Sequence, residues 1–587
     1  MLERLDLSAP AQFALGHYQD SVNRALDELC ALNAVKRAWE RDGHLWANTP
    51  QTVADVEARL GWLDLPVHMA DELPRLRAFA HQAQQDGFTQ VVLLGMGGSS
   101  LAPEVMRNIL GRQAGYLDLR VLDTTDPAEI RHTQDSLDLA HTLFLVSSKS
   151  GTTAETTSLY LYFRALLEEC VGANWPRHMV AIADPGTPLA ALAQQTGFRA
   201  YFAGPADVGG RYSALSFFGL APAALIGANL DALLASARAM SLTSAPHQPA
   251  WENTSLLFGA AMGELARTSC LAHDKLTLIT SPALAPFGPW AEQLVAESTG
   301  KLGVGIVPVE GEPVYAADRY GRDRLFVYLR LATADNTATD ALATALHTAG
   351  HPLISFCLPD LHALGGEFWR WEFATSIAGQ RLGVNPFDQP NVESAKQQAR
   401  QALARYQETR RLEEPQPTLT DDGLVLYGPS PLADQETPAT YLQHFFLAAP
   451  GDYVAIMAYV ERNSANSAQL QRLRQILSCR TGLATTVGFG PRFLHSTGQL
   501  HKGGPAGGIF LQITQDDAQD LAIPGQPYSF GILKRAQALG DLQALQQAGR
   551  RVLRVHLTHT GPDALAHLID ALADALSACP QERPNGA

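Results

Sequence analysis

The sequence has few cysteines, no long apolar run and no excess of positive charge. Its six cysteines are widely separated, so we expect free thiols rather than a disulfide framework or a zinc site. No apolar run reaches the ~20 residues of a membrane span, and the N-terminus does not resemble a signal peptide. The net charge of −15 argues against broad binding of nucleic acid or anionic membranes. We therefore expect a soluble, cytoplasmic protein.

The composition is typical of a folded chain with several domains. Hydrophobic residues make up 46% of the sequence and charged residues 18%, which excludes a largely disordered protein. At roughly 100–200 residues per domain, the length predicts three or four domains. An anionic substrate would need a local positive pocket set against the negative charge of the whole chain.

The hydrophobic pattern divides the chain into four units. Residues 1–85 have helical spacing and predict an N-terminal helical segment. Residues 86–245 and 246–412 alternate short apolar runs with helix-like stretches, which is typical of parallel sheets buried on both faces. A stretch rich in proline and aspartate precedes a similar unit, residues 424–587. We predict an α/β fold of two doubly wound domains with mainly parallel sheets, a helical segment and a C-terminal α/β extension.

Two turns in the first α/β unit are candidates for binding an anion. Gly95–Ser100 and Ser147–Thr153 each lie between a predicted strand and a predicted helix. Ligands bind at the carboxyl ends of strands in open parallel sheets, and amides at a helix N-terminus favour anions. The first turn lacks the full nucleotide P-loop pattern. Taken alone, either turn can also be an ordinary capped helix start.

Two later runs carry further charged side chains. Paired glycines before Arg211 allow a close approach of the backbone and present a guanidinium, although a surface salt bridge is the alternative. In the run 387–396, Glu393 and Lys396 are expected to share a helix face. By periodicity alone, a solvated ion pair is the simpler interpretation of these two residues.

Taken together, these runs resemble motifs of the glucose-6-phosphate isomerase family. That family has a Gly-Gly-Ser turn, a Ser-Lys-x-x-Thr-Thr phosphate loop, and Val-Gly-Gly-Arg-Tyr-Ser, Glu-Ser-Asn-Gly-Lys and Phe-Asp-Gln-x-Gly-Val-Glu-x-x-Lys motifs. Here they stand in family order at Gly97–Ser99, Ser148–Thr153, Val208–Ser213, Glu297–Lys301 and Phe387–Lys396. The resemblance is strongest to the isomerase half of bacterial bifunctional transaldolase/phosphoglucose isomerase chains. Too few residues precede the motifs for a transaldolase barrel, so we expect no transaldolase activity.

The resemblance implies two sugar-isomerase-type domains and an intramolecular oxidoreductase of glycolysis and gluconeogenesis. Such an enzyme interconverts glucose 6-phosphate and fructose 6-phosphate by proton transfer through an enediol(ate), with no cofactor and no metal. A carboxylate moves the proton between C2 and C1, a cation stabilises the oxyanion, and an acid–base group opens the ring. We also expect a homodimer. The alternatives are a non-catalytic sugar-phosphate-binding regulator and an isomerase for another hexose phosphate, such as mannose 6-phosphate.

The resemblance implies Glu312 as the base, with Glu297 as the alternative. Glu312 lies in Gly311-Glu312-Pro313, which begins like the family's base run and then diverges, whereas Glu297 lies in an intact motif. The resemblance also implies that Arg211 stabilises the enediolate and that Lys396 helps to open the ring. Gly98 and Ser99 are expected to line the sugar. The other implied substrate-binding residues are Ser148, Lys149, Ser150, Thr152, Thr153, Thr156 and Gln389.

The family's ring-opening histidine is absent from its usual place in the sequence. The C-terminal unit contains His495 and His501 in a glycine-rich run whose Thr-Gly-Gln-x-His wording resembles the displaced family segment. We predict that this run supplies the missing histidine, within the chain or across a dimer interface. A structural or subunit-contact role for the run is the alternative.

Overall fold

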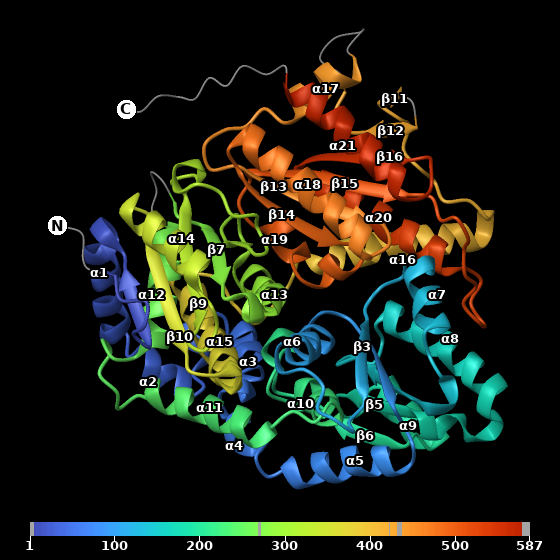
Figure 1. Cartoon of the computed structure of the whole chain (residues 1–587), viewed down its shortest axis with the longest axis horizontal. Coiled ribbons are helices and arrows are strands. Elements are labelled where there is room, and N and C mark those ends of the chain that lie inside the picture. The colour runs from blue at the N-terminus through green and yellow to red at the C-terminus, as the bar shows by residue number, and fades with distance from the viewer. Residues whose placement is uncertain (1–4, 268–271, 422, 431–436, 578–587) are drawn as a thin grey trace.

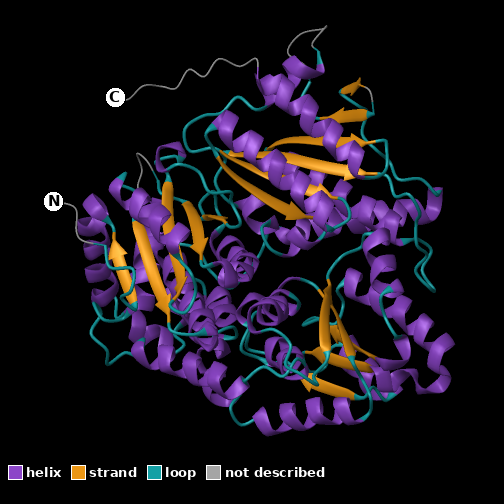
Figure 2. Ribbon diagram, in the orientation of Figure 1, coloured by secondary structure: helices purple, strands orange, loops and turns teal. Residues whose placement is uncertain are grey.

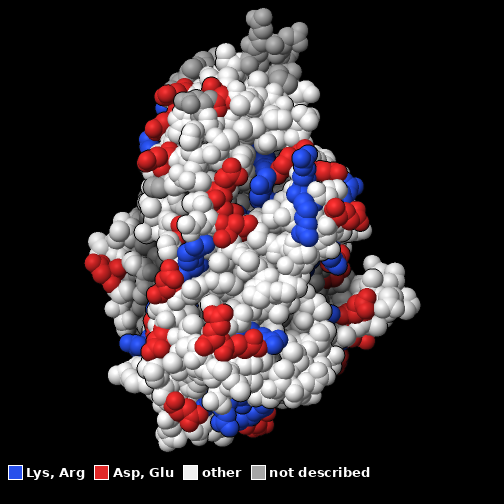
Figure 3. Space-filling view, turned by 90° about the vertical axis from the view of Figure 1, so that its right-hand side faces the viewer, with Lys and Arg blue, Asp and Glu red and all other residues white. Residues whose placement is uncertain are grey.

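The structure is a computed structural model that describes residues 5–267, 272–421, 423–430 and 437–577. Three sheets flanked by helices make up the molecule (Figures 1 and 2). Most neighbouring strands run parallel, which confirms the predicted α/β fold class. No helix within the described ranges is long and apolar enough to cross a membrane. Acidic and basic side chains are interspersed on the face drawn in Figure 3, so the negative charge does not form one patch there.

The first sheet has the strand order β3-β2-β4-β5-β6, and all its strands are parallel. Apolar residues on both faces explain its burial: Val91 and Leu93 join one core, and Val92 and Leu94 join another. Its strands are β2 (Gln90–Gly95), β3 (Asp118–Leu122), β4 (Thr142–Ser147), β5 (Met179–Ala183) and β6 (Ala200–Ala203). Its helices are α5 (Leu73–Gln85), α6 (Leu101–Leu110), α7 (Pro127–Asp135), α8 (Ala154–Val171), α9 (Pro188–Thr196) and α10 (Phe217–Leu225).

The second sheet has the order β1-β10-β9-β7-β8, and its edge strand comes from the N-terminal segment. This strand, β1 (Ala11–Ala14), runs antiparallel to β10, whereas the sequence predicted only helices there. The other strands are β7 (Lys275–Thr280), β8 (Val307–Val309), β9 (Arg324–Leu331) and β10 (Leu353–Leu358). The N-terminal helices are α1 (Gln19–Ala31), α2 (Ala34–Trp39), α3 (Pro50–Glu57) and α4 (Leu65–His68). The helices of the second unit are α11 (Leu230–Thr243), α12 (Thr254–Arg267), α13 (Gly288–Thr299), α14 (Thr337–Thr348) and α15 (Leu364–Leu382).

The third sheet belongs to the C-terminal unit and has the order β11-β12-β16-β15-β13-β14. Its last four strands in this order are parallel, and β11 and β12 form an antiparallel edge. The strands are β11 (Leu419–Asp421), β12 (Leu424–Tyr427), β13 (Tyr453–Tyr459), β14 (Ala484–Phe489), β15 (Gly508–Gln515) and β16 (Arg551–Leu557). The helices are α17 (Pro438–Phe445), α18 (Ser464–Thr481), α19 (Gly498–Gly503), α20 (Phe530–Gln547) and α21 (Pro562–Ser577). α16 (Val392–Thr409) precedes residue 424 in the sequence but packs against α20, so we describe it with this unit.

Apolar packing joins the three sheets to one another. The first two sheets and the N-terminal helices share one continuous core. The third sheet has a core of its own on one face, and its other face packs with Val307 and Val309 of β8. Leu403 of α16 and Leu533 of α20 extend the core on the other face of the first sheet. The C-terminal unit, orange to red in Figure 1, therefore packs against both α/β units, and α16 and α20 make its apolar contact with the first.

Candidate active site

The Ser147–Thr153 loop follows β4, next to the point where the strand order of the first sheet reverses. β2 has β3 on one side and β4 on the other, and ligands of open α/β sheets bind at the carboxyl ends of such strands. The Ser148 and Thr153 hydroxyls lie 2.9 Å apart, and those of Ser150 and Thr152 lie 3.0 Å apart. The loop leads directly into α8, whose first amides have no partner within the helix. The loop therefore combines hydroxyl donors with the positive end of a helix, which suits a phosphate.

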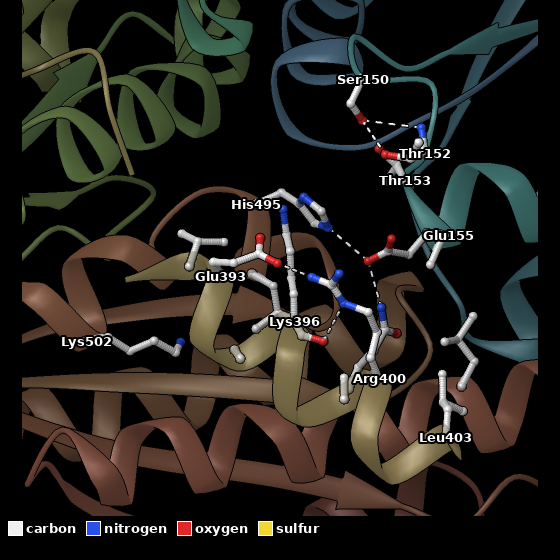
Figure 4. A pocket seen from close by; sticks show the side chains of 17 residues that line it. Ser150, Thr152, Thr153, Glu155, Glu393, Lys396, Arg400, Leu403, His495 and Lys502 are labelled. Carbon is white, nitrogen blue, oxygen red and sulfur yellow. Dashed lines mark hydrogen bonds and ion pairs between the residues drawn. The ribbon is translucent and has the colours of Figure 1, made fainter. Parts of the chain in front are cut away.

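Ser150, Thr152 and Thr153 line a cavity of about 440 Å³, which we call the site cavity (Figure 4). The other candidates of the loop point elsewhere. Lys149 pairs with Asp184, and burial lowers its pKa. The Thr156 hydroxyl is buried and has no hydrogen-bond partner among the described residues. The part of the loop that faces the cavity is thus its hydroxyl-rich second half.

Arg211 is a buried cation with several polar contacts, and its side chain is only 4% exposed. Its Nη2 donates to the carbonyl oxygens of Pro386 and Asp388 at 2.7 and 2.9 Å. Its Nη1 lies 3.1 Å from Gln389 Oε1 and 3.2 Å from Glu297 Oε1. A guanidinium whose two Nη atoms are both hydrogen-bonded keeps one orientation. Arg211 therefore presents a fixed positive charge beside the Glu297 carboxylate.

The Gly-Gly-Ser turn packs directly against this group. A Cβ atom at Gly98 would lie 2.1 Å from the carbonyl oxygen of Gly210, the residue before Arg211. A Cβ atom at Gly97 would lie 2.8 Å from both Gln293 Nε2 and the His495 carbonyl oxygen. Only glycine allows such approaches, so the turn brings the backbones of residues 210 and 495 to the same place.

Gln293 of α13 links the carboxylate to the histidine segment. Its Nε2 donates to Glu297 Oε2 at 3.2 Å and to the His495 carbonyl oxygen at 2.7 Å. Glu297 comes from a helix of the second unit, and His495 comes from a 3₁₀ turn, η11 (Arg492–His495), that follows β14 of the third sheet. Elements of all three units therefore meet at one point.

His495 lines the site cavity and faces a carboxylate that the sequence analysis missed. His495 Nε2 lies 2.8 Å from Glu155 Oε1, which also accepts a hydrogen bond from Gln537 Nε2 at 2.7 Å (Figure 4). Burial alone would raise the pKa of Glu155, but His495 and Lys396 outweigh burial and lower it. Glu155 is therefore held as an anion. Its place in the first turn of α8, just after the phosphate loop, was the only sequence signal for it.

Lys396 also lines the site cavity, from α16 on the side opposite the phosphate loop (Figure 4). Glu393, its expected partner on the helix face, forms an ion pair with Arg400 instead. The Arg400 Nε donates to the Lys396 carbonyl oxygen at 3.2 Å. The charge of Lys396 is thus directed toward the cavity and Glu155 rather than into the solvated pair that periodicity alone suggested.

Two of the predicted catalytic residues lie apart from this group. Glu312 forms a two-point ion pair with Arg324 at 3.0 and 3.1 Å, and both side chains are 2% exposed. His501 is buried between the rings of Phe493 and Phe510, and burial lowers its pKa well below the usual value. Neither residue lines the site cavity. Arg211 and Glu297 do not line it either, but Gln293 joins Glu297 to His495, which does.

Metal-ligating residues do not gather in the described part of the chain. Across these ranges, no cluster of three or more histidine, cysteine, aspartate or glutamate residues could hold a metal ion. Glu155 contacts His495 at the cavity wall, and the Arg211–Glu297 ion pair adjoins them through Gln293. Such a set is suited to proton transfer and to stabilising negative charge.

Comparison with known proteins gives matches to one family. The model of the family "Phosphoglucose isomerase" matches residues 68–308. A glucose-6-phosphate isomerase of Thermus thermophilus is 31% identical over 387 residues, which cover 59% of this chain and 90% of that protein. The chain belongs to the glucose-6-phosphate isomerase family. A second family member, from a Cyanothece species, is 28% identical over 72% of this chain and 85% of its own length.

Solved structures show the same fold. A hypothetical protein of Thermus thermophilus matches with a TM-score of 0.57 and 28% identity, over 67% of this chain and 100% of its own. A glucose-6-phosphate isomerase from Chlamydia trachomatis matches with a TM-score of 0.54 and 18% identity, over 68% of this chain and 89% of its own. At that identity, the second likeness concerns the fold alone.

Proposed function

We propose that this member of the glucose-6-phosphate isomerase family interconverts glucose 6-phosphate and fructose 6-phosphate between the site cavity and the adjoining Arg211–Glu297 ion pair. The observation that carries the proposal is that Gln293 links this ion pair to the Glu155–His495 contact, which lies beside a hydroxyl-rich loop at a helix N-terminus. The loop would hold the phosphate, and the sugar would extend from it toward the two pairs.

We assign the base to Glu297 rather than to Glu312. Glu297 is 12% exposed and lies 3.2 Å from Arg211, so its carboxylate and the guanidinium can act on adjacent atoms of one substrate. Glu297 would remove the C2 proton of the aldose and return it at C1. Arg211 would stabilise the negative charge that develops on the enediolate oxygen. The Glu312 carboxylate has both oxygens engaged by Arg324, which leaves it poorly placed for the same task.

We assign ring opening to His495, with Lys396 beside it. Glu155 Oε1 faces Nε2 of the imidazole, which leaves Nδ1 to exchange a proton with the sugar. Lys396 would neutralise negative charge near the ring oxygen. Gln389 and the Gly98–Ser99 turn would position the sugar between Arg211 and His495. In this arrangement the C-terminal unit supplies a catalytic residue.

The test compares the two histidines with a coupled assay that follows conversion of fructose 6-phosphate to glucose 6-phosphate. General acid–base groups contribute about 10²–10⁴-fold, so His495→Ala should lower kcat by at least about 10²-fold. His501→Ala should lower the melting temperature, because it removes a buried side chain, but it should leave kcat within a few-fold. Substrate binding without turnover by the unmodified chain would favour the regulator; preferential turnover of mannose 6-phosphate would favour the other isomerase.

Family resemblance also supports three further proposals. We propose a cytoplasmic homodimer that works in glycolysis and gluconeogenesis, and sedimentation at several concentrations tests the dimer. We propose that the sequence is most closely allied to the isomerase half of bifunctional transaldolase/phosphoglucose isomerase chains, on the wording of its two glycine- and serine-rich turns. A transaldolase assay on this chain should show no activity.

A further inference from the structure

The segment that carries His495 begins at an arginine that is paired with two carboxylates. Arg492 is the first residue of η11, three positions before His495. Its Nη1 lies 2.9 Å from Asp123 Oδ2, and its Nη2 pairs with Glu104. Asp123 follows β3, and Glu104 lies in α6, so both carboxylates belong to the first unit. The start of η11 is therefore tied to the unit that carries the phosphate loop.

A second arginine binds the same two carboxylates. Arg462, which follows β13, lies 3.2 Å from Glu104 Oε1 and 3.2 Å from Asp123 Oδ1, and its Nε is 3.3 Å from Glu129. We call Arg462, Arg492, Glu104, Asp123 and Glu129 the interdomain cluster. Arg462 and Arg492 both come from the carboxyl edge of the third sheet, but only Arg492 lies on the segment that ends at His495.

Burial gives the interdomain cluster a definite geometry. Asp123 is 1% exposed and also accepts a hydrogen bond from Ser100 at 3.1 Å. Burial alone would raise the pKa of Glu104, but Arg492 and Arg462 outweigh it and bring the pKa down to about 2. Buried charges are tolerated only when they are well paired, so a displaced guanidinium would leave a carboxylate uncompensated. The cluster therefore resists small shifts of η11.

The far end of η11 is held by different contacts. Gln293 binds the His495 carbonyl oxygen at 2.7 Å, and Glu155 faces the His495 ring at 2.8 Å. Both contacts depend on where η11 begins, because a turn of four residues cannot absorb a shift of its first residue. A shift at Arg492 would thus be transmitted to the imidazole.

We propose that Arg492 is a positioning residue for this reaction: by pairing with Glu104 and Asp123 it fixes η11 so that His495 meets Glu155 at the wall of the site cavity. This inference rests on the proposed function, in which His495 exchanges a proton with the sugar. Arg492 does not touch the substrate. Its effect is exerted through the placement of the imidazole, and a misplacement of about 1 Å can cost about 10²-fold in rate.

The test uses Arg492→Met and the matched control Arg462→Met, because both arginines bind Glu104 and Asp123. Arg492→Met should lower kcat by about 10²-fold and leave KM within about 3-fold. Arg462→Met should leave kcat within about 5-fold, although both variants should melt at a lower temperature. Equal losses of kcat would show that the cluster only docks the units and would overturn the inference. If Arg492→Met does not fold, Arg492→Lys and Arg462→Lys replace the pair, with the same expected order.

A second readout separates this inference from the proposed function. The His495 ring signal is identified in the NMR spectrum of histidine-labelled protein by its loss in His495→Ala. That signal should move in Arg492→Met and stay in place in Arg462→Met. A signal that stays in place in Arg492→Met overturns the positioning role, whether or not the enzyme turns over. Loss of the proposed function would appear separately, as an unmodified protein without isomerase activity.

Discussion

Replacing Gly98 with alanine tests the contact on which the site geometry depends. The new Cβ atom would lie 2.1 Å from the Gly210 carbonyl oxygen and 2.9 Å from the Arg211 amide nitrogen. Ordinary contacts of carbon with other heavy atoms lie near 3.5 Å, so the two backbones must separate by more than about 1 Å. Both atoms belong to the backbone, and no side-chain rotation can relieve the overlap. A shift of the Arg211 backbone would strain the contacts that hold its guanidinium beside Glu297.

The expected loss follows from that displacement. A shift of about 1 Å at a reacting group can cost about 10²-fold, which corresponds to about 2.7 kcal/mol of transition-state stabilisation. In the coupled assay, kcat for fructose 6-phosphate should therefore fall about 10²-fold in Gly98→Ala. Competitive inhibition by inorganic phosphate should stay within about 3-fold of the unmodified enzyme, because the phosphate loop is not displaced. Overpacking should also lower stability by about 1–3 kcal/mol.

Gly210→Ala is the matched control for this prediction. It makes the same chemical change on the other side of the same contact, yet a Cβ atom at Gly210 would meet nothing within 4 Å. Its kcat should stay within about 3-fold of the unmodified enzyme. If a folded Gly98→Ala kept full turnover, or if both variants lost it equally, the close approach would not govern the placement of Arg211.

Two further predictions concern charged side chains of the second α/β unit. Glu297→Gln should lower kcat by about 10³-fold. Glu312→Gln leaves buried Arg324 without its carboxylate partner, so it should cost about 3–5 kcal/mol of stability but keep kcat within a few-fold in the folded protein. The reverse pattern of kcat would show that Glu312 is the base. Burial, with Arg211 nearby, lowers the pKa of Lys301 to about 7. The unfolded chain then binds more protons than the native one between about pH 7 and 10, so stability rises with pH there. Urea unfolding should show the difference in unfolding free energy between wild type and Lys301→Met growing by up to about 1.4 kcal/mol per pH unit from pH 7 to 9, and a constant difference would contradict this pKa.

Local patterns in the sequence predicted the buried strands and the helix that begins after Thr153 well. Fully apolar runs such as Val91–Leu94 form strands wherever both faces of a sheet are buried, and hydroxyls before a helix mark its capped start. The strand β1 was missed because four residues of mixed polarity carry no recognisable period. Its conformation depends on pairing with β10, more than 300 residues away. Tertiary pairing, not local propensity, decides such an element.

The site was less predictable because its contacts join distant residues. The Glu155–His495 contact spans 340 positions, and the Gln537–Glu155 hydrogen bond spans 382. No periodicity can indicate a partner at such separations. The local match at Gly311-Glu312-Pro313 pointed to Glu312, but a short motif does not show which way a side chain faces. The nearby Arg324 decides that direction.

The origin of His495 in the third sheet has a consequence for how the molecule matures. During synthesis, domains tend to fold from the N-terminus onward. The first two sheets share a core that contains no residue of the C-terminal unit, so they can pack before that unit is complete. We therefore expect a nascent chain that acquires affinity for phosphorylated sugars before it acquires turnover. Its last folding event, the docking of the C-terminal unit, would convert a protein that only binds anions into a catalyst.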